Sequence, residues 1–307
     1  MSKFALADNM DRVETRSPMV DRLLILNRLP WYARLPIKWV LWGLVILVVC
    51  YPYPNRLVRH LRHWTDPNQL VEPDAPALKP MIQELRAELP DDLAPQVALQ
   101  HIERFVYRKI PYAWDWETWG VVDYLPTVAE VIEQGREDCD GRAVVAASLL
   151  RNFGFEAYLV NDLAHMWVRT DAGDTMSPGK QAIAVATEDG FEIHIPGFVD
   201  SLQALAFGVA VFPVGREFII LLALWMLLLR GNTGVGRNLI ALALLAAGLM
   251  LTRHASSNLQ NPQVGLQLVG AGALVTATLI QLLGARHGAL VSTDQAAGDS
   301  SRRRQPG

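Results

Sequence analysis

Four long apolar stretches, separated by sequence of mixed character, dominate the hydrophobic pattern of the chain. They cover residues 39–54, 209–229, 238–252 and 264–285. A helix needs about 20 apolar residues to cross a bilayer, with a usual range of about 17–25. The last stretch has this length and no charged side chain, and the shorter ones can span with the help of flanking residues that extend to the interface. The pattern therefore predicts about four transmembrane helices.

These stretches divide the chain into five parts. We expect a cytoplasmic N-terminal segment (1–38), a transmembrane helix (39–54), a soluble domain (55–205), about three transmembrane helices (206–286) and a disordered tail (287–307). Residues 201–214 are open to two interpretations, an interfacial helix or one arm of a hairpin that adds a membrane pass.

The basic residues beside the apolar stretches indicate the orientation. Cytoplasmic loops are enriched in Lys and Arg, and these residues are frequent before the first stretch and in the tail. Both termini are therefore expected in the cytoplasm and the soluble domain outside it, although Arg56, Arg59 and Arg62 oppose this orientation.

Between the first and second stretches the sequence is that of an ordinary globular domain. Apolar periodicity predicts helices over 81–89, 95–109, 128–133 and 139–153, followed by strands over 155–160, 164–170, 175–186 and 191–195. A hairpin turn is expected at 171–174. Helices followed by an antiparallel sheet define an α+β domain.

Charge and cysteine content narrow the functional classes. The net charge of −3 gives no reason to expect nucleic acid as a partner. Two cysteines exclude a disulfide framework as the main source of stability, because Cys50 lies in an apolar stretch and Cys139 in a charged one. Cys139 is therefore expected to be a free thiol.

Cys139 lies where a helix is expected to begin, which suits a nucleophile. A thiol reacts as the thiolate, and a helix N-terminus or a neighbouring imidazolium lowers its pKa. The first N–H groups of the helix can also form an oxyanion hole. His165 begins a later strand that can return beside this N-terminus. The sequence therefore predicts a Cys–His pair, in which the thiol attacks and the imidazole moves the proton.

Several short motifs around this pair resemble a known superfamily. The motifs are Ile110-Pro-Tyr112, Asp115, Trp119-Gly120, Asp123-Tyr124, Asp138-Cys139-Asp140, the helix that ends at Gly154, and Ala164-His165-Met166. This pattern resembles the transglutaminase-like superfamily and is most similar to bacterial transglutaminase-like cysteine proteinases. The resemblance covers residues 95–175, and the membrane helices are not part of it.

The resemblance implies a papain-like cysteine hydrolase core. Together with the apolar stretches, it leads us to expect a bacterial inner-membrane protein. Cys139 would attack an amide of a peptide or protein, and His165 would shuttle the proton. No cofactor would be required, but some members bind calcium through carboxylates beside the nucleophile, which correspond to Asp138 and Asp140. Whether water or an amine accepts the acyl group stays open.

The third residue of such a site, which orients the histidine, is less clear. Asp174 is the expected acid, and Ser177 and Gln181 are the polar alternatives. Asp171 and Asp174 are expected at the tip of the hairpin, where six to nine strand residues at about 3.3 Å each place them up to about 20 Å from His165. With a two-residue turn at 172–173, Lys180 would lie opposite His165, with Ser177 and Gln181 as the nearest polar residues. The alternative function is therefore a non-catalytic membrane protein that uses a degenerate transglutaminase-like fold to bind a peptide or partner.

Overall fold

The structure is a computed structural model that describes residues 29–90, 93–179, 183–187, 190–193, 195–229, 234–258 and 261–283. The chain divides into two compact units. One contains Val45–Ile220 and Ala247–Gly272, and the other contains Met1–Leu44, Leu221–Ala246 and Ala273–Gly307. Most of the predicted N-terminal segment, the whole predicted tail and Gln181 lie outside the described residues.

Three described helices are long and apolar enough to cross a membrane. They are α2 (Trp31–Cys50), α11 (Val235–Ser256) and α12 (Val264–Leu283). A bent pair, α9 (Phe198–Val211) and α10 (Val214–Leu228), meets the same criterion only when its two helices are taken together. About four transmembrane helices were predicted. The described residues contain three candidate spans, or four if the bent pair counts as one span.

The bent pair replaces a span that was expected to be continuous. α9 and α10 meet at an angle of 111°. The break contains Pro213, which has no N–H to donate and whose ring clashes with a preceding carbonyl in a helix. An uninterrupted helix over 209–229 is therefore wrong. Most of the ambiguous segment 201–214 belongs to α9, and the domain boundary predicted at residue 205 falls inside this helix.

The other membrane helices differ from prediction at their ends. α2 begins at Trp31 instead of residue 39, and it therefore includes Arg34 and Lys38. α11 extends beyond 238–252 at both ends and includes Arg237 and Arg253. Long basic side chains can extend along the helix so that their charged groups reach the membrane interface. A charged residue near the end of an apolar stretch therefore does not mark the end of the helix.

The polar region begins with helices. After α2 come α3 (Pro54–Trp64), two short 3₁₀ turns, α4 (Lys79–Glu88), α5 (Pro95–Lys109), α6 (Asp115–Thr118), α7 (Val128–Gln134) and α8 (Cys139–Asn152). The four predicted helices correspond to α4, α5, α7 and α8, with ends that differ by two residues at most. Gly154 has a φ of +88°, as expected for the residue after a helix C-terminus.

The strands follow and form one antiparallel sheet, which confirms an α+β arrangement. β1 (Ala157–Asn161), β2 (Met166–Thr170), β3 (Gly173–Thr175), β4 (Ala184–Thr187) and β5 (Gly190–Ile193) lie in the order β3-β2-β1-β4-β5. Thr170 pairs with Gly173, so Asp171 and Ala172 form the turn. The predicted turn at 172–173 is wrong by one residue, which shifts the pairing register by two.

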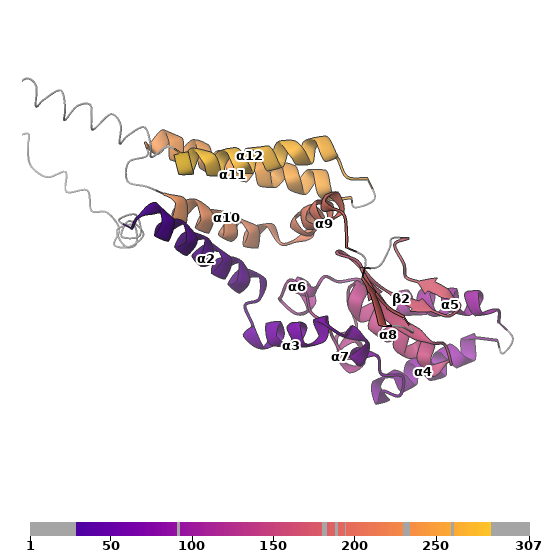
Figure 1. Ribbon diagram of the computed structural model, residues 1–307. Helices are drawn as coiled ribbons and strands as arrows, with labels where there is room; N and C mark the ends of the chain where they lie inside the picture. Colours follow the sequence, from indigo (N-terminus) through magenta and orange to yellow (C-terminus); the bar gives the residue numbers. More distant parts are fainter. Residues whose placement is uncertain are drawn as a thin grey trace, which may run out of the picture. The chain divides into compact units, whose positions relative to one another are not determined.

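α8 is the centre of the polar region and lies against the sheet that contains β2 (Figure 1). All residues from Ala143 to Leu150 are buried, and they are mostly small or aliphatic. A helix that is apolar on all sides is suited to burial on all sides. Phe105 of α5 and Trp167 of β2 are fully buried in the same core. This packing fixes the N-terminus of α8, where the predicted nucleophile lies.

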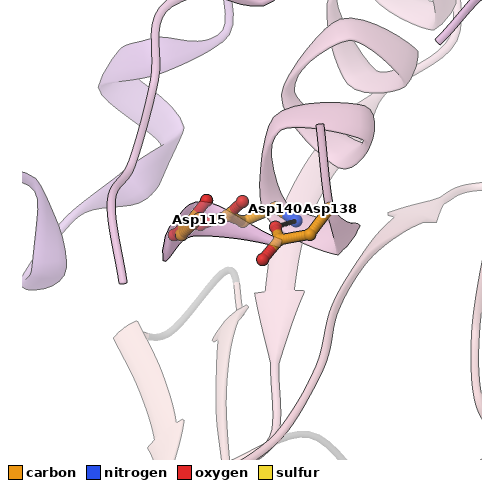
Figure 2. Close-up of side chains that lie close together, drawn as sticks. All are labelled: Asp115, Asp138 and Asp140. Atoms are coloured by element: carbon orange, nitrogen blue, oxygen red, sulfur yellow. Dashed lines mark hydrogen bonds between the residues drawn. The ribbon is translucent and has the colours of Figure 1, made fainter. Parts of the chain in front are cut away.

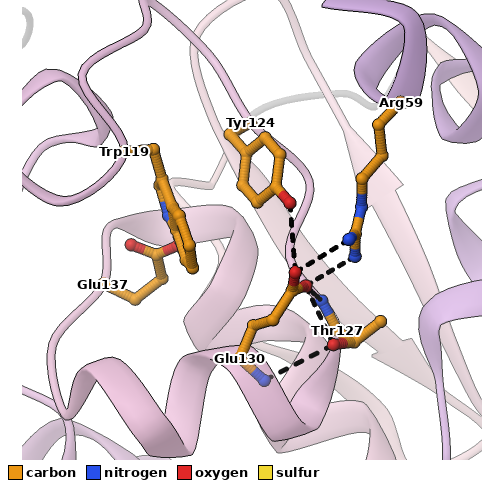
Figure 3. Close-up of polar contacts among 6 residues, drawn as sticks. All are labelled: Arg59, Trp119, Tyr124, Thr127, Glu130 and Glu137. Carbon is orange, nitrogen blue, oxygen red and sulfur yellow. Dashed lines mark hydrogen bonds and ion pairs between the residues drawn. The ribbon is translucent and has the colours of Figure 1, made fainter. Parts of the chain in front are cut away.

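Glu130 on α7 joins α3 to this domain (Figure 3). Both of its carboxylate oxygens accept hydrogen bonds from Arg59 of α3, at 2.7 and 2.5 Å. It also accepts from the Tyr124 hydroxyl and from the N–H and hydroxyl of Thr127. Burial alone would raise the pKa of Glu130, but the Thr127 bonds and the Arg59 charge outweigh it and lower the pKa.

We predict that Glu130→Gln destabilises the folded chain by about 2 kcal/mol, because Arg59 loses its charged partner. This corresponds to a melting temperature lower by roughly 5 °C in detergent micelles. Because the folded pKa is depressed, the stabilisation exists above the unfolded value near 4.5 and is lost as the pH falls through the folded pKa. Glu133→Gln, on the exposed face of α7, is the control. An equal loss in both variants contradicts this role.

Candidate active site and metal centre

Cys139 is the first residue of α8, as predicted. Asp138 precedes it as the N-cap, and the Asp138 Oδ1 accepts a hydrogen bond from the Asp140 N–H at 3.2 Å. The Cys139 side chain is partly buried and forms no disulfide. The backbone N–H of Met166, at the start of β2, donates a hydrogen bond to its sulfur. The thiol therefore lies between the N-terminus of α8 and the beginning of β2.

Three carboxylates form a cluster at the start of α8 (Figure 2). Asp115, Asp138 and Asp140 each offer an oxygen, and these oxygens all lie within 4.8 Å of one another. Asp138 and Asp140 flank Cys139 in the sequence, whereas Asp115 comes from α6. Two unit charges at this distance repel by roughly 3 kcal/mol at an effective dielectric constant of about 20. Three ionised carboxylates are therefore unfavourable here without a compensating positive charge.

Asp115 has an oxygen that no described residue satisfies. Its side chain is only 1% exposed, and its Oδ2 accepts the N–H of Tyr124 at 2.5 Å. Its Oδ1 is buried without a hydrogen-bond partner among the described residues. An unpaired buried carboxylate oxygen is costly, and such cases call for a structural or functional explanation. A bound cation would supply one.

The local pKa values follow from burial and this crowding. Burial first, and then the Asp138 charge, raise the pKa of both Asp115 and Asp140 well above the usual range. The same two causes raise the pKa of the Cys139 thiol, although the Met166 N–H acts in the opposite direction. The thiol pKa is therefore raised and not lowered, contrary to the expectation from the helix N-terminus, and burial is the main cause.

The residues fit a calcium ion. Calcium takes six to eight oxygen ligands, often from Asp side chains, and neutralises the charge around it. The predicted ligands Asp138 and Asp140 lie together, and Asp115 is a third candidate that sequence analysis did not assign. Asp115 lies more than twenty residues earlier in the chain, and only its place in the family pattern marked it. The fit rests on the three carboxylates and on the unpaired Oδ1.

A fourth acid, Glu137, is fully buried behind the cluster. Its Oε1 accepts the indole N–H of Trp119 at 2.6 Å (Figure 3). Burial raises its pKa to about 8. Gly141 leaves room for it, because a Cβ there would lie 2.0 Å from the Glu137 Cγ. The glycine two residues after Cys139 therefore has a packing role.

His165 lies immediately before β2, and its ring is oriented by the backbone. The Nε2 lies 3.0 Å from the carbonyl oxygen of Met176. A carbonyl can only accept, so Nε2 carries the proton and Nδ1 is the basic nitrogen. The ring also stacks on Trp167 at 6.4 Å between centroids. Among the described residues, no hydrogen bond joins this ring to Cys139, although Met166, the next residue in the chain, contacts the sulfur.

The acid expected to orient this histidine has other partners. Asp174 accepts the Trp167 indole N–H at 3.0 Å and two hydrogen bonds from Arg169. The Arg169 hydrogen bonds, partly opposed by burial, lower the pKa of Asp174. The Ser177 hydroxyl accepts the N–H of Gly179 at 3.1 Å. Neither residue bonds to His165, and Gln181 lies outside the described residues.

The Met176 carbonyl therefore occupies the orienting position, and its backbone is unusual. Met176 has a φ of +60°, the left-handed region that a residue with a Cβ seldom adopts. Glu103 on α5 stabilises this conformation, because its Oε2 accepts the Thr175 hydroxyl at 2.7 Å and the Met176 N–H at 3.2 Å. Sequence analysis missed both residues, since a backbone acceptor has no signature in the side-chain pattern.

Two of the N–H groups that were expected to form an oxyanion hole at the start of α8 already have partners. The Asp140 N–H donates to Asp138, and the Gly141 N–H donates to the Asp140 side chain at 2.7 Å. These amides are therefore already occupied by carboxylate oxygens. A substrate oxygen could use them only after the two side chains turn away, for example toward a cation.

Comparisons with known proteins do not identify the chain. No protein-family model matches it, and the curated proteins contain no match to its sequence.

We predict that calcium stabilises the full chain at neutral pH, because the cation binds the folded carboxylate cluster and not the unfolded chain. A concentration one hundred times the dissociation constant adds about 2.7 kcal/mol. This raises the melting temperature by roughly 5 to 10 °C. The measurement is thermal unfolding in detergent, with a chelator as the reference state.

The matched variants are Asp138→Asn and Asp171→Asn. Asparagine caps a helix as well as aspartate, so Asp138→Asn keeps α8 and removes one ligand charge. It should abolish most of the calcium effect. Asp171 lies in the exposed turn before β3, and its replacement should leave the effect intact. A calcium response that survives Asp138→Asn would falsify the site.

Proposed function

We propose that this chain is a membrane-bound thiol enzyme of the transglutaminase-like type, which hydrolyses amide bonds of peptides or proteins. The observation that carries the proposal is the position of Cys139. It lies at the N-terminus of a buried helix, its sulfur receives the N–H of Met166, and the neighbouring His165 has its Nε2 committed to a carbonyl. A nucleophile, a base with a defined basic nitrogen and an orienting acceptor are the parts that such a reaction needs.

In the proposed reaction, the Nδ1 of His165 accepts the proton of the Cys139 thiol. The sulfur attacks the carbonyl carbon of the amide, and the C–N bond breaks as the imidazolium returns its proton to the leaving amine. Water then attacks the thioester, releases the carboxylic acid and regenerates the thiol. An amine in place of water would give transamidation, and the family resemblance favours hydrolysis.

A calcium ion held by Asp115, Asp138 and Asp140 would neutralise the charges that raise the thiol pKa. The residues of the chain supply the other requirements. The Met176 carbonyl keeps the His165 ring in one tautomer, and Glu103 keeps that carbonyl in place. We also propose that the chain is a bacterial inner-membrane protein with the domain outside the cytoplasm, on the basis of its flanking Lys and Arg residues.

The experiment that tests this function measures alkylation of Cys139 by iodoacetamide in the full chain with calcium present. A Cys50→Ser background leaves one thiol. We predict that His165→Ala slows labelling at neutral pH by at least about tenfold, since a thiol pKa higher by one unit reduces the thiolate fraction by that factor.

The control is His101→Ala, a histidine on α5 that is not part of the proposed site. It should leave the rate unchanged. Slow labelling, typical of an ordinary thiol and equal in all three proteins, counts against an activated nucleophile.

The second candidate function is peptide or partner binding by the same fold without catalysis. Two observations favour it: the raised pKa of the Cys139 thiol and the occupied amides at the start of α8. Both describe the chain without a cation. The alkylation experiment therefore also separates these functions, because a binding protein has no need of a thiol that responds to His165.

A further inference from the structure

The loop that carries Asp115 is attached to the ends of two apolar helices. The N–H of Val122 donates to the carbonyl of Cys50, the last residue of α2, at 2.9 Å. The carbonyl of Gly120 accepts a hydrogen bond from Arg216, in the first turn of α10, at 3.0 Å. The Tyr124 N–H then closes the loop on Asp115. The carboxylate cluster is therefore tied to two points where the chain enters the apolar region.

Aromatic side chains add a third attachment, to the bent helix pair. Trp114 and Trp116, on either side of Asp115, stack with their centroids 4.8 Å apart. Trp114 contacts Phe207 of α9 at 6.4 Å, and Trp116 contacts Phe212 at the break at 5.7 Å. Rings of tryptophan are favoured at the boundary between water and lipid. The wall of the site and the bent pair therefore share one aromatic cluster.

The bent pair is held firmly in its shape. Arg253 of α11 donates to the carbonyls of Val209 and Phe212, at 2.7 and 2.6 Å, and also bonds to Glu217 of α10. These contacts satisfy carbonyls that the break leaves without helical partners. The break is therefore a stabilised feature of the fold.

α9 exposes an apolar surface, which lipid would cover favourably. Phe198 is 78% exposed and Leu205 is 66% exposed, and Asp200 is its one charged residue. It continues directly into α10, which belongs to an apolar run. Together with α10 it forms a bent apolar pair, the geometry of a broken span or a re-entrant segment. The aromatic cluster joins this pair to the residues beside Asp115.

The distance from the membrane to the nucleophile is short. The path starts at the Cys50 carbonyl, crosses its hydrogen bond to Val122 and follows the chain to Tyr124. It then crosses the hydrogen bond from Tyr124 to Asp115 and the gap from Asp115 to the other two carboxylates. At about 3.3 Å per extended residue this is less than about 20 Å. An extended chain that emerges from the bilayer beside α2 can therefore reach the carboxylates that flank Cys139.

We propose that the site acts on polypeptides tethered to the same membrane, at an amide bond within about ten residues of the substrate's own membrane segment or lipid anchor. Ten extended residues reach about 33 Å, which covers the distance above. Confinement to one surface also raises the effective concentration of such a substrate. This inference rests on the proposed function and adds the substrate class.

The test compares cells that carry the full chain with cells that carry Cys139→Ser. New protein N-termini are identified by mass spectrometry in the membrane fraction and in the surrounding medium. The proposal predicts new termini that depend on Cys139 and lie within about ten residues of a membrane segment or lipid-modified residue. Cys139-dependent termini in soluble proteins, or far from any anchor, overturn the substrate class and leave the proposed function standing. No Cys139-dependent terminus at all counts against the function itself.

A second measurement uses one substrate found in this way and proteoliposomes that contain the full chain. The anchored substrate should be cleaved at least about tenfold faster than the same segment offered as a free peptide at equal total concentration. A spacer of twenty residues between anchor and cleavage site should abolish most of this advantage. Equal rates for anchored and free forms contradict the proposal, whether or not Cys139 proves catalytic.

Discussion

Three carboxylates crowded at the N-terminus of α8, beside a thiol, are the constraint on which the rest of this structure depends. One comes from α6 and two flank Cys139, and burial deprives Asp115 and Asp140 of the water that would screen the repulsion. Protons or a cation must neutralise them. The raised pKa of Asp115, Asp140 and Cys139 has this common origin. The arrangement is unfavourable in itself, and a divalent cation would turn it into a binding site.

The histidine side of the site shows how a backbone group can take a role that is usually assigned to a side chain. The Met176 carbonyl holds the Nε2 of His165, and Met176 does so from a left-handed conformation that costs about 1–3 kcal/mol. Glu103 offsets part of this cost through two hydrogen bonds. The expected acid, Asp174, is left to bind Arg169 and Trp167. An orienting group of this kind is not visible in a list of polar residues.

The successes and failures of sequence analysis follow from the range of the interactions involved. The apolar periodicity of α5 and the Asp138 cap and Gly154 at the ends of α8 are local signals, so the positions of these helices and the place of Cys139 were predictable. Asp115 and Met176 depend on contacts between distant segments, which one sequence does not reveal. The break at Pro213 was missed because hydrophobicity alone continues through it. The turn lies at Asp171 and Ala172, so β2 and β3 pair in a different register from the expected one. The choice of residues that could orient His165 had relied on the expected register.

The most direct test of the central constraint is terbium luminescence, because a lanthanide occupies calcium sites and is excited by nearby tryptophan. Trp114 and Trp116 flank Asp115 and would act as the sensitiser. The account predicts saturable emission from about one ion per chain, which calcium displaces and Asp138→Asn abolishes. Emission that never saturates, or that persists in Asp138→Asn, would contradict the claim that these carboxylates form a cation site.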